Sequence, residues 1–384
     1  MKQNVKKKHS LKIGILGNGF MGRMRAHAYL TVAHIMDDLP FVPELVAVSG
    51  LDEKSLEAFT GDFNIGFYTK NWADIVDDES IDIINICLPE NLHAEPAIRA
   101  LEQGKHVFCE KALALDAASA LEMTRAAEQS GKINMCGMNY RFLPAVQLAR
   151  DLIHNGDLGN IYTMHACYFQ ESGHDPYRPV EEVLYAYGEN ALGSARGLGS
   201  HVIDTCRFLL GEMSVLNACF KTFVPERKTK SGDLYRVEVD DFASMTVEFE
   251  TGAIGMLSTS KVAAGRKNWF RFEINGSKGS LEFNLQDLNT LRVFLPDRSP
   301  SQLSGFTDIS VTEKAHPLMS PWWPPAHNLG WEHSHINEIH HFLYSIANNQ
   351  DVGPSGATFH DGYRAVELVE QAESSSGFIK HPAL

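Results

Sequence analysis

The sequence lacks paired cysteines, long apolar runs and an excess of positive charge. Its six cysteines stand singly, with no Cys-x-x-Cys pair, so we expect buried, reduced thiols rather than disulfides or metal ligands. No segment approaches the roughly 18 consecutive apolar residues of a membrane-spanning helix. Acidic residues outnumber basic ones by 48 to 34, which argues against a nucleic-acid partner or an anionic membrane surface.

The basic residues that do cluster lie at the N-terminus, in MKQNVKKKHS. No apolar segment with a small-residue cleavage site follows them, so we expect a solvated tail rather than a signal peptide, and a cytoplasmic protein. A length of 384 residues predicts two domains, which we place at residues 1–138 and 139–384.

A glycine motif follows the first apolar run. Residues 11–16 read as a strand, and Gly17-x-Gly19-x-x-Gly22 then leads into a helix-like segment. Strand, glycines and helix in this order are typical of a dinucleotide site. There the first glycine makes the turn, the second admits a pyrophosphate and the third packs helix on strand.

Apolar strands continue to alternate with helices through residue 138, which predicts a parallel, doubly wound sheet. Ligands bind such sheets at the carboxyl ends of the strands, where the sequence places polar residues. The second strand ends near Gly50, and Asp52 is its nearest acid, so the sequence favours NAD without excluding NADP. The predicted cofactor-binding residues are Gly17, Asn18, Gly19, Phe20, Met21, Gly22, Asp52, Leu88, Pro89, Asn91, His93, Glu110, Lys111, Asn139 and Arg141.

The segment SARGLGSHVIDTCRFLLGE places one histidine, His201, at the start of a run with helical apolar spacing. Asp204 lies three residues further on, within reach along one helix face. Two interpretations are open from the segment alone: His201 is a catalytic acid or base, or it is a packed residue in the first helical turn.

Beyond residue 160 the pattern changes to alternating strands, which predicts an α+β domain with a mostly antiparallel sheet. A long polar loop, QESGHDPYRPVEEVLYAYGENALG, and an aromatic segment, WWPPAHNLGWEHSHINEIHH, interrupt it. Aromatic rings beside polar groups are typical of carbohydrate sites, although ordinary surface and core roles remain open for both segments. Since no His-x-x-x-His spacing occurs between His327 and His341, we expect no metal.

Four segments together resemble the glucose–fructose oxidoreductase/inositol dehydrogenase (Gfo/Idh/MocA) family. They are GNGFMGRMRAHAY, LPENLHAEPAIRALEQGKHVFCEKALALD, GMNYRFLPAVQLARDLIHNGDLGNI and GLGSHVIDTCRFLLGE. Late segments such as FEINGSKGSLEF are most similar to the levoglucosan dehydrogenase and pyranoside 3-dehydrogenase branch. The resemblance implies a Rossmann domain holding a nicotinamide cofactor, a second domain carrying the sugar, and a homo-oligomer, dimer or tetramer.

The resemblance also implies roles for two residues. Lys111 matches the lysine of the family's Glu-Lys-Pro motif, with Ala112 in place of proline, and His201 matches the histidine of its Asp-x-Gly-x-His motif. The aspartate of that motif is replaced by Gly197. We therefore predict Lys111 and His201 as catalytic. The candidate substrate-binding residues are Lys111, Tyr140, Gln170, His174, Arg196, His201, Trp331 and His333.

The predicted function is NAD(P)-dependent oxidation or reduction of a secondary hydroxyl, at C3, of a pyranose, glycoside or cyclitol. Two alternatives remain. The first is redox-neutral glycoside cleavage or epimerisation through a transient 3-keto sugar. The second is a non-catalytic NAD(P)-binding sugar sensor.

Overall fold

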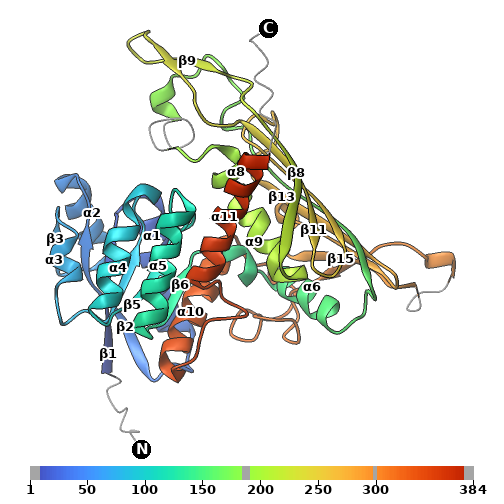
Figure 1. The fold of residues 1–384 in the computed structure, drawn as a ribbon. Helices are drawn as coiled ribbons and strands as arrows, with labels where there is room; N and C mark the ends of the chain where they lie inside the picture. Colours follow the sequence, from blue (N-terminus) through green and yellow to red (C-terminus); the bar gives the residue numbers. More distant parts are fainter. Residues whose placement is uncertain (1–8, 184–190, 297–300, 376–384) are drawn as a thin grey trace, which may run out of the picture. The chain divides into compact units, whose positions relative to one another are not determined.

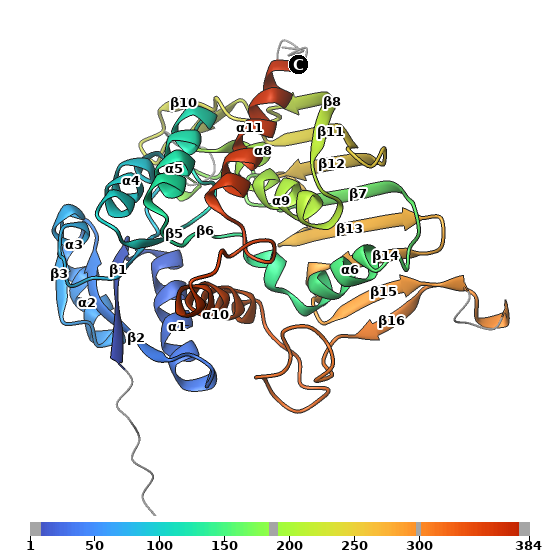
Figure 2. The same ribbon diagram turned by 60° about the horizontal axis from the view of Figure 1, so that its bottom comes forward.

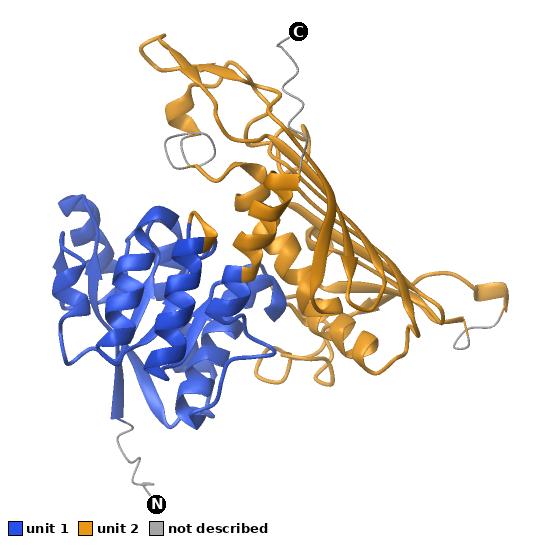
Figure 3. Cartoon of the chain, in the orientation of Figure 1, with its two compact units in different colours: residues 1–114, 118–142, 330–363 blue, residues 115–117, 143–329, 364–384 orange. Residues whose placement is uncertain are grey.

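The computed structural model describes residues 9–183, 191–296 and 301–375, shown as a ribbon in Figure 1. The chain forms two compact units, coloured in Figure 3. Unit 1 comprises residues 1–114, 118–142 and 330–363, and unit 2 comprises residues 115–117, 143–329 and 364–384. Unit 1 thus includes a late segment, residues 330–363, in addition to the N-terminal residues of the predicted first domain.

Unit 1 is built on a six-stranded sheet with the order β3-β2-β1-β4-β5-β6, in which every pairing is parallel. Its strands are β1 (His9–Leu16), β2 (Phe41–Ser49), β3 (Phe67–Thr69), β4 (Ile83–Ile86), β5 (His106–Cys109) and β6 (Asn134–Cys136). Its helices are α1 (Phe20–Ile35), α2 (Glu53–Phe63), α3 (Ala73–Val76), α4 (Ala94–Glu102), α5 (Ala117–Ser130) and α10 (Glu332–Asn348). The predicted doubly wound sheet is confirmed.

Helices cover both faces of this sheet. Figure 2 shows α1 beside α10 on one face and α4 with α5 on the other. This two-sided cover explains why β4 (IINI) is buried along its whole length and is mostly apolar, with buried Asn85 as its single polar residue.

Unit 2 is built on an eight-stranded sheet with the order β16-β15-β14-β13-β7-β12-β11-β8. Its strands are β7 (Ile161–Phe169), β8 (Met213–Lys221), β11 (Phe242–Phe249), β12 (Ile254–Ser260), β13 (Trp269–Gly276), β14 (Ser280–Asn284), β15 (Thr290–Phe294) and β16 (Thr307–Ser310). The predicted mostly antiparallel sheet is confirmed. Only β7 and β12 pair in parallel within it. A separate hairpin joins β9 (Glu226–Lys228) to β10 (Leu234–Arg236).

One face of the eight-stranded sheet carries helices. The helices α6 (Pro144–His154), α8 (Gly193–Gly197) and α9 (Gly199–Leu210) pack on it, with α9 against β7 and β12. The strands alternate accordingly, as in β13, whose residues Phe270, Phe272 and Ile274 are fully buried. Helix α11 (Phe359–Ser375) begins in unit 1 and ends in unit 2.

The burial of the cysteines differs in part from the prediction. Cys109, Cys136 and Cys206 are buried, but Cys219 is exposed because it lies on the face of β8 that its buried neighbours do not share. All six are free thiols. Among the described residues, no helix is long and apolar enough to span a membrane, and no group of three His, Cys, Asp or Glu side chains is placed to hold a metal ion.

Candidate functional site

The glycine motif forms an open cradle at the start of α1 in unit 1. Gly17 has a φ of +100°, and a Cβ there would lie 2.4 Å from the carbonyl oxygen of Cys87. A Cβ on Gly22 would lie 2.0 Å from the carbonyl oxygen of Gly17. A Cβ on Gly19 would meet nothing within 4 Å. The fold itself therefore requires glycine at Gly17 and Gly22, whereas the space above Gly19 is open for a ligand.

That space lies at the N-terminus of a 16-residue helix. Gly19 is the N-cap of α1 and offers no side-chain hydrogen bond to the first turn. An anion held there gains the amide N–H groups and the positive end of the helix dipole. The residues present therefore fit the pyrophosphate of a dinucleotide.

The end of β2 adjoins the same loop. Asn18 Nδ2 donates to Ser55 Oγ at 2.9 Å, and a Cβ on Gly50 would lie 2.4 Å from Asn18 Oδ1. Asp52 is the N-cap of α2, and its carboxylate accepts from the Ser55 N–H at 2.8 Å. The predicted residues Asn18 and Asp52 are thus brought together, and Asp52 has a capping role that the sequence analysis did not assign.

Two other predicted cofactor residues are buried and hold loops in place. His93 has Nε2 2.8 Å from the Leu88 carbonyl oxygen and Nδ1 3.2 Å from that of Leu113. Asn139 donates to Ser334 Oγ at 2.8 Å. Pro89 and Asn91 are exposed.

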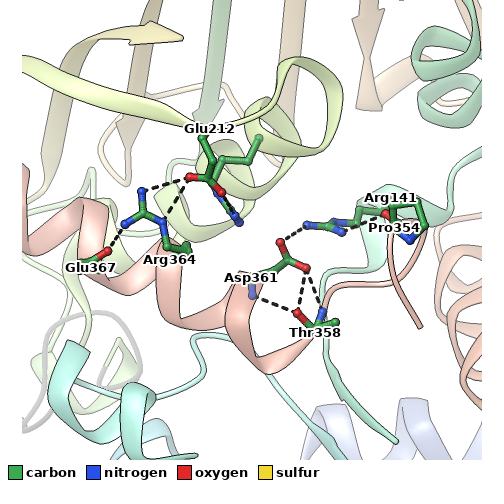
Figure 4. Close-up of polar contacts among 8 residues, drawn as sticks. Arg141, Glu212, Pro354, Thr358, Asp361, Arg364 and Glu367 are labelled. Carbon is green, nitrogen blue, oxygen red and sulfur yellow. Dashed lines mark hydrogen bonds and ion pairs between the residues drawn. The ribbon is translucent and has the colours of Figure 1, made fainter. Parts of the chain in front are cut away.

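Arg141 anchors the segment that leads into α11. Its Nη1 donates to the Gly356 carbonyl at 3.1 Å. Figure 4 shows its contacts with the Pro354 carbonyl, at 3.5 Å from Nη1, and with Asp361 Oδ1, at 3.4 Å from Nη2. Asp361 and Thr358 exchange hydrogen bonds as a capping box. The Thr358 N–H donates to Asp361 Oδ2 at 3.0 Å, and the Asp361 N–H donates to Thr358 Oγ1 at 3.3 Å. Arg141 therefore supports the start of α11, and its contact with a cofactor stays a prediction.

Lys111 follows the end of β5 and is half-buried. The residue before it, Glu110, belongs to an ion cluster that the sequence analysis missed. Arg25 Nε donates to Glu110 Oε1 at 2.6 Å, and Arg25 Nη1 donates to Glu338 Oε2 at 2.6 Å. The guanidinium carbon of Arg25 also lies 4.3 Å from the ring centre of Phe108. The cluster links α1, the end of β5 and α10 beside Lys111.

Burial disfavours the charged forms in this cluster, so it shifts the pKa values of its acidic and basic groups in opposite directions. Arg25 and Glu338 are fully buried. Burial raises the pKa of Glu338 above its usual range, although Arg25 favours the charged carboxylate. Burial also lowers the pKa of His335 well below its usual range, and the ring Nδ1 lies 3.8 Å from Glu338 Oε2. His335 is therefore neutral near pH 7.

The aromatic segment is divided between the two units: residues 322–329 belong to unit 2, and the rest, from Gly330, belongs to unit 1. Trp331 stacks on Phe20, the residue after Gly19, with ring centres 5.9 Å apart and planes at 19°. His333 Nδ1 accepts from the Gly330 N–H at 3.1 Å, and burial lowers its pKa. Tyr140 is buried. The sequence analysis grouped Trp331 and His333 with the second domain, whereas the structure places them beside the glycine loop.

His201 lies in the first turn of α9 in unit 2, as predicted, and is 7% exposed. Its ring centre is 6.0 Å from that of Tyr168, whose hydroxyl donates to Asn268 Oδ1 at 2.6 Å. Gln170 Nε2 donates to the same oxygen at 2.8 Å. Gln170 was predicted, while Tyr168 on β7 and Asn268 just before β13 were missed because they are remote in sequence from His201. Asp204 is buried on α9.

Two predicted substrate residues in unit 2 make protein contacts. Arg196 donates to Glu373 from Nε at 3.2 Å and from Nη2 at 2.6 Å, and it also donates to the Leu115 carbonyl. His174 is exposed, with its Nδ1 2.7 Å from the Glu171 carbonyl oxygen. The part of the predicted loop at residues 184–190 lies outside the described residues.

Half-buried Asp240 and buried Lys261 lie next to α8. The carboxylate of Asp240 accepts from the N–H groups of Ser194 and Ala195 at 3.1 and 3.0 Å. Burial raises the pKa of Asp240, although these donors and the charge of Lys261 favour the ionised form. Lys261 is 4% exposed, and its Nζ lies 3.5 Å from the place of a Cβ on Gly197.

Segments of both units match models of known protein families. Residues 11–138 match the model of an oxidoreductase family with an NAD-binding Rossmann fold, and residues 146–282 match the GFO/IDH/MocA C-terminal domain. The chain is 34% identical to a levoglucosan dehydrogenase of Pseudarthrobacter phenanthrenivorans, over 94% of this chain and 95% of that protein. It is 26% identical to an inositol 2-dehydrogenase of Rhizobium meliloti, over 95% and 97%.

Solved structures of similar proteins have the same fold. A levoglucosan dehydrogenase in complex with NADH and L-sorbose aligns with a TM-score of 0.90 and 33% identity, covering 96% of this chain and 98% of that one. An oxidoreductase domain protein from Kribbella flavida aligns with a TM-score of 0.89 and 34% identity, covering 96% and 97%.

Proposed function

We propose that this chain, which belongs to the GFO/IDH/MocA oxidoreductase family and has its NAD-binding Rossmann domain, is an NAD-dependent dehydrogenase of a sugar, glycoside or cyclitol. The observation that carries the proposal is the open cradle above Gly19 at the start of α1, with Lys111 at the end of β5 in the same unit. Relatives named for levoglucosan and inositol oxidation support a carbohydrate hydroxyl as the reacting group.

In the proposed reaction a secondary alcohol becomes a ketone. Bound NAD supplies the acceptor for the hydride from carbon. The hydroxyl proton goes to the protein, where Lys111 Nζ binds the hydroxyl oxygen and an imidazole nitrogen of His201 accepts the proton. The ammonium of Lys111 then stabilises the developing negative charge on oxygen.

The test is NADH formation with levoglucosan, myo-inositol, glucose and methyl glucosides. Lys111→Ala should abolish turnover while NAD binding persists, and Lys54→Ala, at an exposed position on α2, should behave as the wild type. Absence of NADH with every substrate, although NAD is bound, would overturn the proposal. The same absence with a sugar product formed would instead identify redox-neutral chemistry.

We further propose C3 as the oxidised carbon. A pyranose deuterated at C3 should deliver its label to NADH, detected by mass spectrometry of the cofactor. Unlabelled NADH formed from that sugar would assign the reaction to another carbon and leave the dehydrogenase activity standing.

We also propose a cytoplasmic homo-oligomer, dimer or tetramer. Exposed apolar side chains on the face of the eight-stranded sheet opposite α9, including Ile254 and Met256 at 36% and 49% exposure, support an interface between copies. Light scattering after size-exclusion chromatography measures the mass; a monomer at micromolar concentration would contradict the assignment.

A further inference from the structure

We propose that Lys261 determines substrate specificity by binding an anionic substituent, a carboxylate or phosphate, beside Gly197. This inference rests on the proposed function, because it names the class of carbohydrate that the enzyme oxidises.

The start of α9 runs along the ends of two parallel strands. In the pairing of β7 with β12, Tyr168 is opposite Thr259. The His201 ring contacts Tyr168 from the helix side, and a Cβ on Gly199 would lie 3.6 Å from Thr259 Cγ2. Tyr168 and Thr259 therefore both face the helix that carries His201.

Lys261 continues this face. It is the residue directly after the end of β12, and it is 4% exposed. Its Nζ is 3.5 Å and its Cε 3.8 Å from the place of a Cβ on Gly197, four residues before His201. The ammonium thus occupies the position toward which any side chain at residue 197 would point.

An ammonium and a carboxylate at this position would bind different substrate groups. A carboxylate accepts hydrogen bonds from hydroxyls, whereas the ammonium of Lys261 only donates and carries three N–H groups. With three donors, Lys261 can serve a protein acceptor and a ligand oxygen together. Charge-assisted bonds to carboxylate or phosphate are about twice as strong as neutral ones, so an anionic oxygen is favoured over a hydroxyl.

Neighbouring charged groups leave this role to Lys261. The charge of Lys261 favours the ionised form of Asp240, but this carboxylate also accepts from the N–H groups of Ser194 and Ala195 at the start of α8, so Lys261 is not its sole donor. Arg196, the other cation beside Gly197, is held through two nitrogens by Glu373. The amides of Gln170 and Asn268 near Tyr168 are neutral groups suited to sugar hydroxyls.

The experiment compares matched substrate pairs: methyl glucuronide with methyl glucoside, and glucose 6-phosphate with glucose. The wild type should prefer the anionic member of at least one pair in kcat/KM, and the pair that shows this identifies carboxylate or phosphate. Lys261→Gln should reduce that preference about tenfold or more, through KM, because a hydrogen bond to a charged group is lost. Lys228→Gln, at an exposed position on β9, removes the same charge and should leave the preference intact.

Substitutions at residue 197 give an independent test. Gly197→Asp should abolish the preference, because the new carboxylate would pair with Lys261, while Gly197→Ala adds only a methyl group and should retain it. Preference for the neutral member of both pairs in the wild type, or equal losses for both members in Lys261→Gln, would overturn the inference.

Binding measurements separate this inference from the proposed function. Calorimetry of the NADH-loaded protein reports affinity for each member of a pair without turnover. If no sugar is oxidised but the anionic member binds more tightly and only Lys261→Gln and Gly197→Asp remove the difference, the dehydrogenase proposal fails and the anion site stands. Equal binding of both members by the wild type would overturn the anion site.

Discussion

Arg25 and Glu110 form a buried ion pair in which the guanidinium Nε lies 2.6 Å from the carboxylate Oε1. The same guanidinium reaches Glu338, and Arg25 and Glu338 have no exposed side-chain surface. Removing one partner of a buried pair costs about 3–5 kcal/mol, because the remaining charge stays uncompensated. We therefore expect Arg25→Met to lower the free energy of unfolding by that amount in urea denaturation.

Helix α1 contains its own control. Arg23 pairs with Asp62, but both side chains are about half exposed, at 48% and 54%, and exposed pairs contribute about 0–1 kcal/mol. Arg23→Met should therefore cost less than about 1 kcal/mol. Equal losses for Arg23→Met and Arg25→Met would show that burial does not set the strength of the Arg25 cluster.

The glycine motif predicts two different defects. Gly17→Ala should destabilise the fold, because Gly17 has a φ of +100° and its new Cβ would lie 2.4 Å from a carbonyl oxygen. Gly19→Ala should leave the melting temperature unchanged, because nothing lies within 4 Å, yet weaken NAD binding about tenfold by filling the space for the pyrophosphate. Thermal unfolding and NAD titration measure the two effects. Unchanged NAD affinity in Gly19→Ala would place the cofactor elsewhere.

Asp52 combines a cap with a predicted cofactor contact. Asp52→Ala should destabilise the protein by about 1 kcal/mol, since the bond to the Ser55 N–H is lost, whereas Asp52→Asn keeps an accepting oxygen and should not. Both variants should weaken NAD binding if the carboxylate accepts from the ribose hydroxyls. Full NAD affinity in Asp52→Asn would show that the Asp52 carboxylate caps α2 and does not bind the cofactor.

Short-range patterns made the nucleotide-binding sheet predictable. The mostly apolar segment of β4 and the turn at Gly17 each depend on a few neighbouring residues, and so does the first helical turn at His201 in unit 2. The local steric and burial requirements of these segments are strong enough to fix their conformation without knowledge of distant contacts.

Long-range partners were not predictable. Glu338 lies 313 positions from Arg25, and no local pattern in one sequence indicates which distant acid a buried arginine meets. The same limit applies to Trp331, which the structure places against Phe20 rather than in the second domain. It also applies to Lys261, which comes near Gly197 only because β12 and α8 pack together in the fold.

His106 makes the stability of the protein depend on pH. Burial is the main cause that lowers the pKa of His106 to about 4, and the neutral Nδ1 accepts from the Ile133 N–H at 3.0 Å. The unfolded chain binds the proton at its ordinary pKa of about 6.5, so between these two values protonation favours unfolding. The contribution of His106 is therefore complete above pH 6.5 and is lost progressively as pH falls toward 4.

Urea unfolding between pH 7.5 and pH 5 measures this effect, with both pH values chosen to span the upper part of the window. The wild type should lose stability on acidification, and His106→Gln, which cannot titrate, should lose less. Exposed His27 provides the matched control, since its substitution removes an imidazole from the surface rather than from a buried position. His27→Gln should follow the wild-type curve. A pH dependence that is identical in His106→Gln and the wild type would show that other groups cause the acid sensitivity.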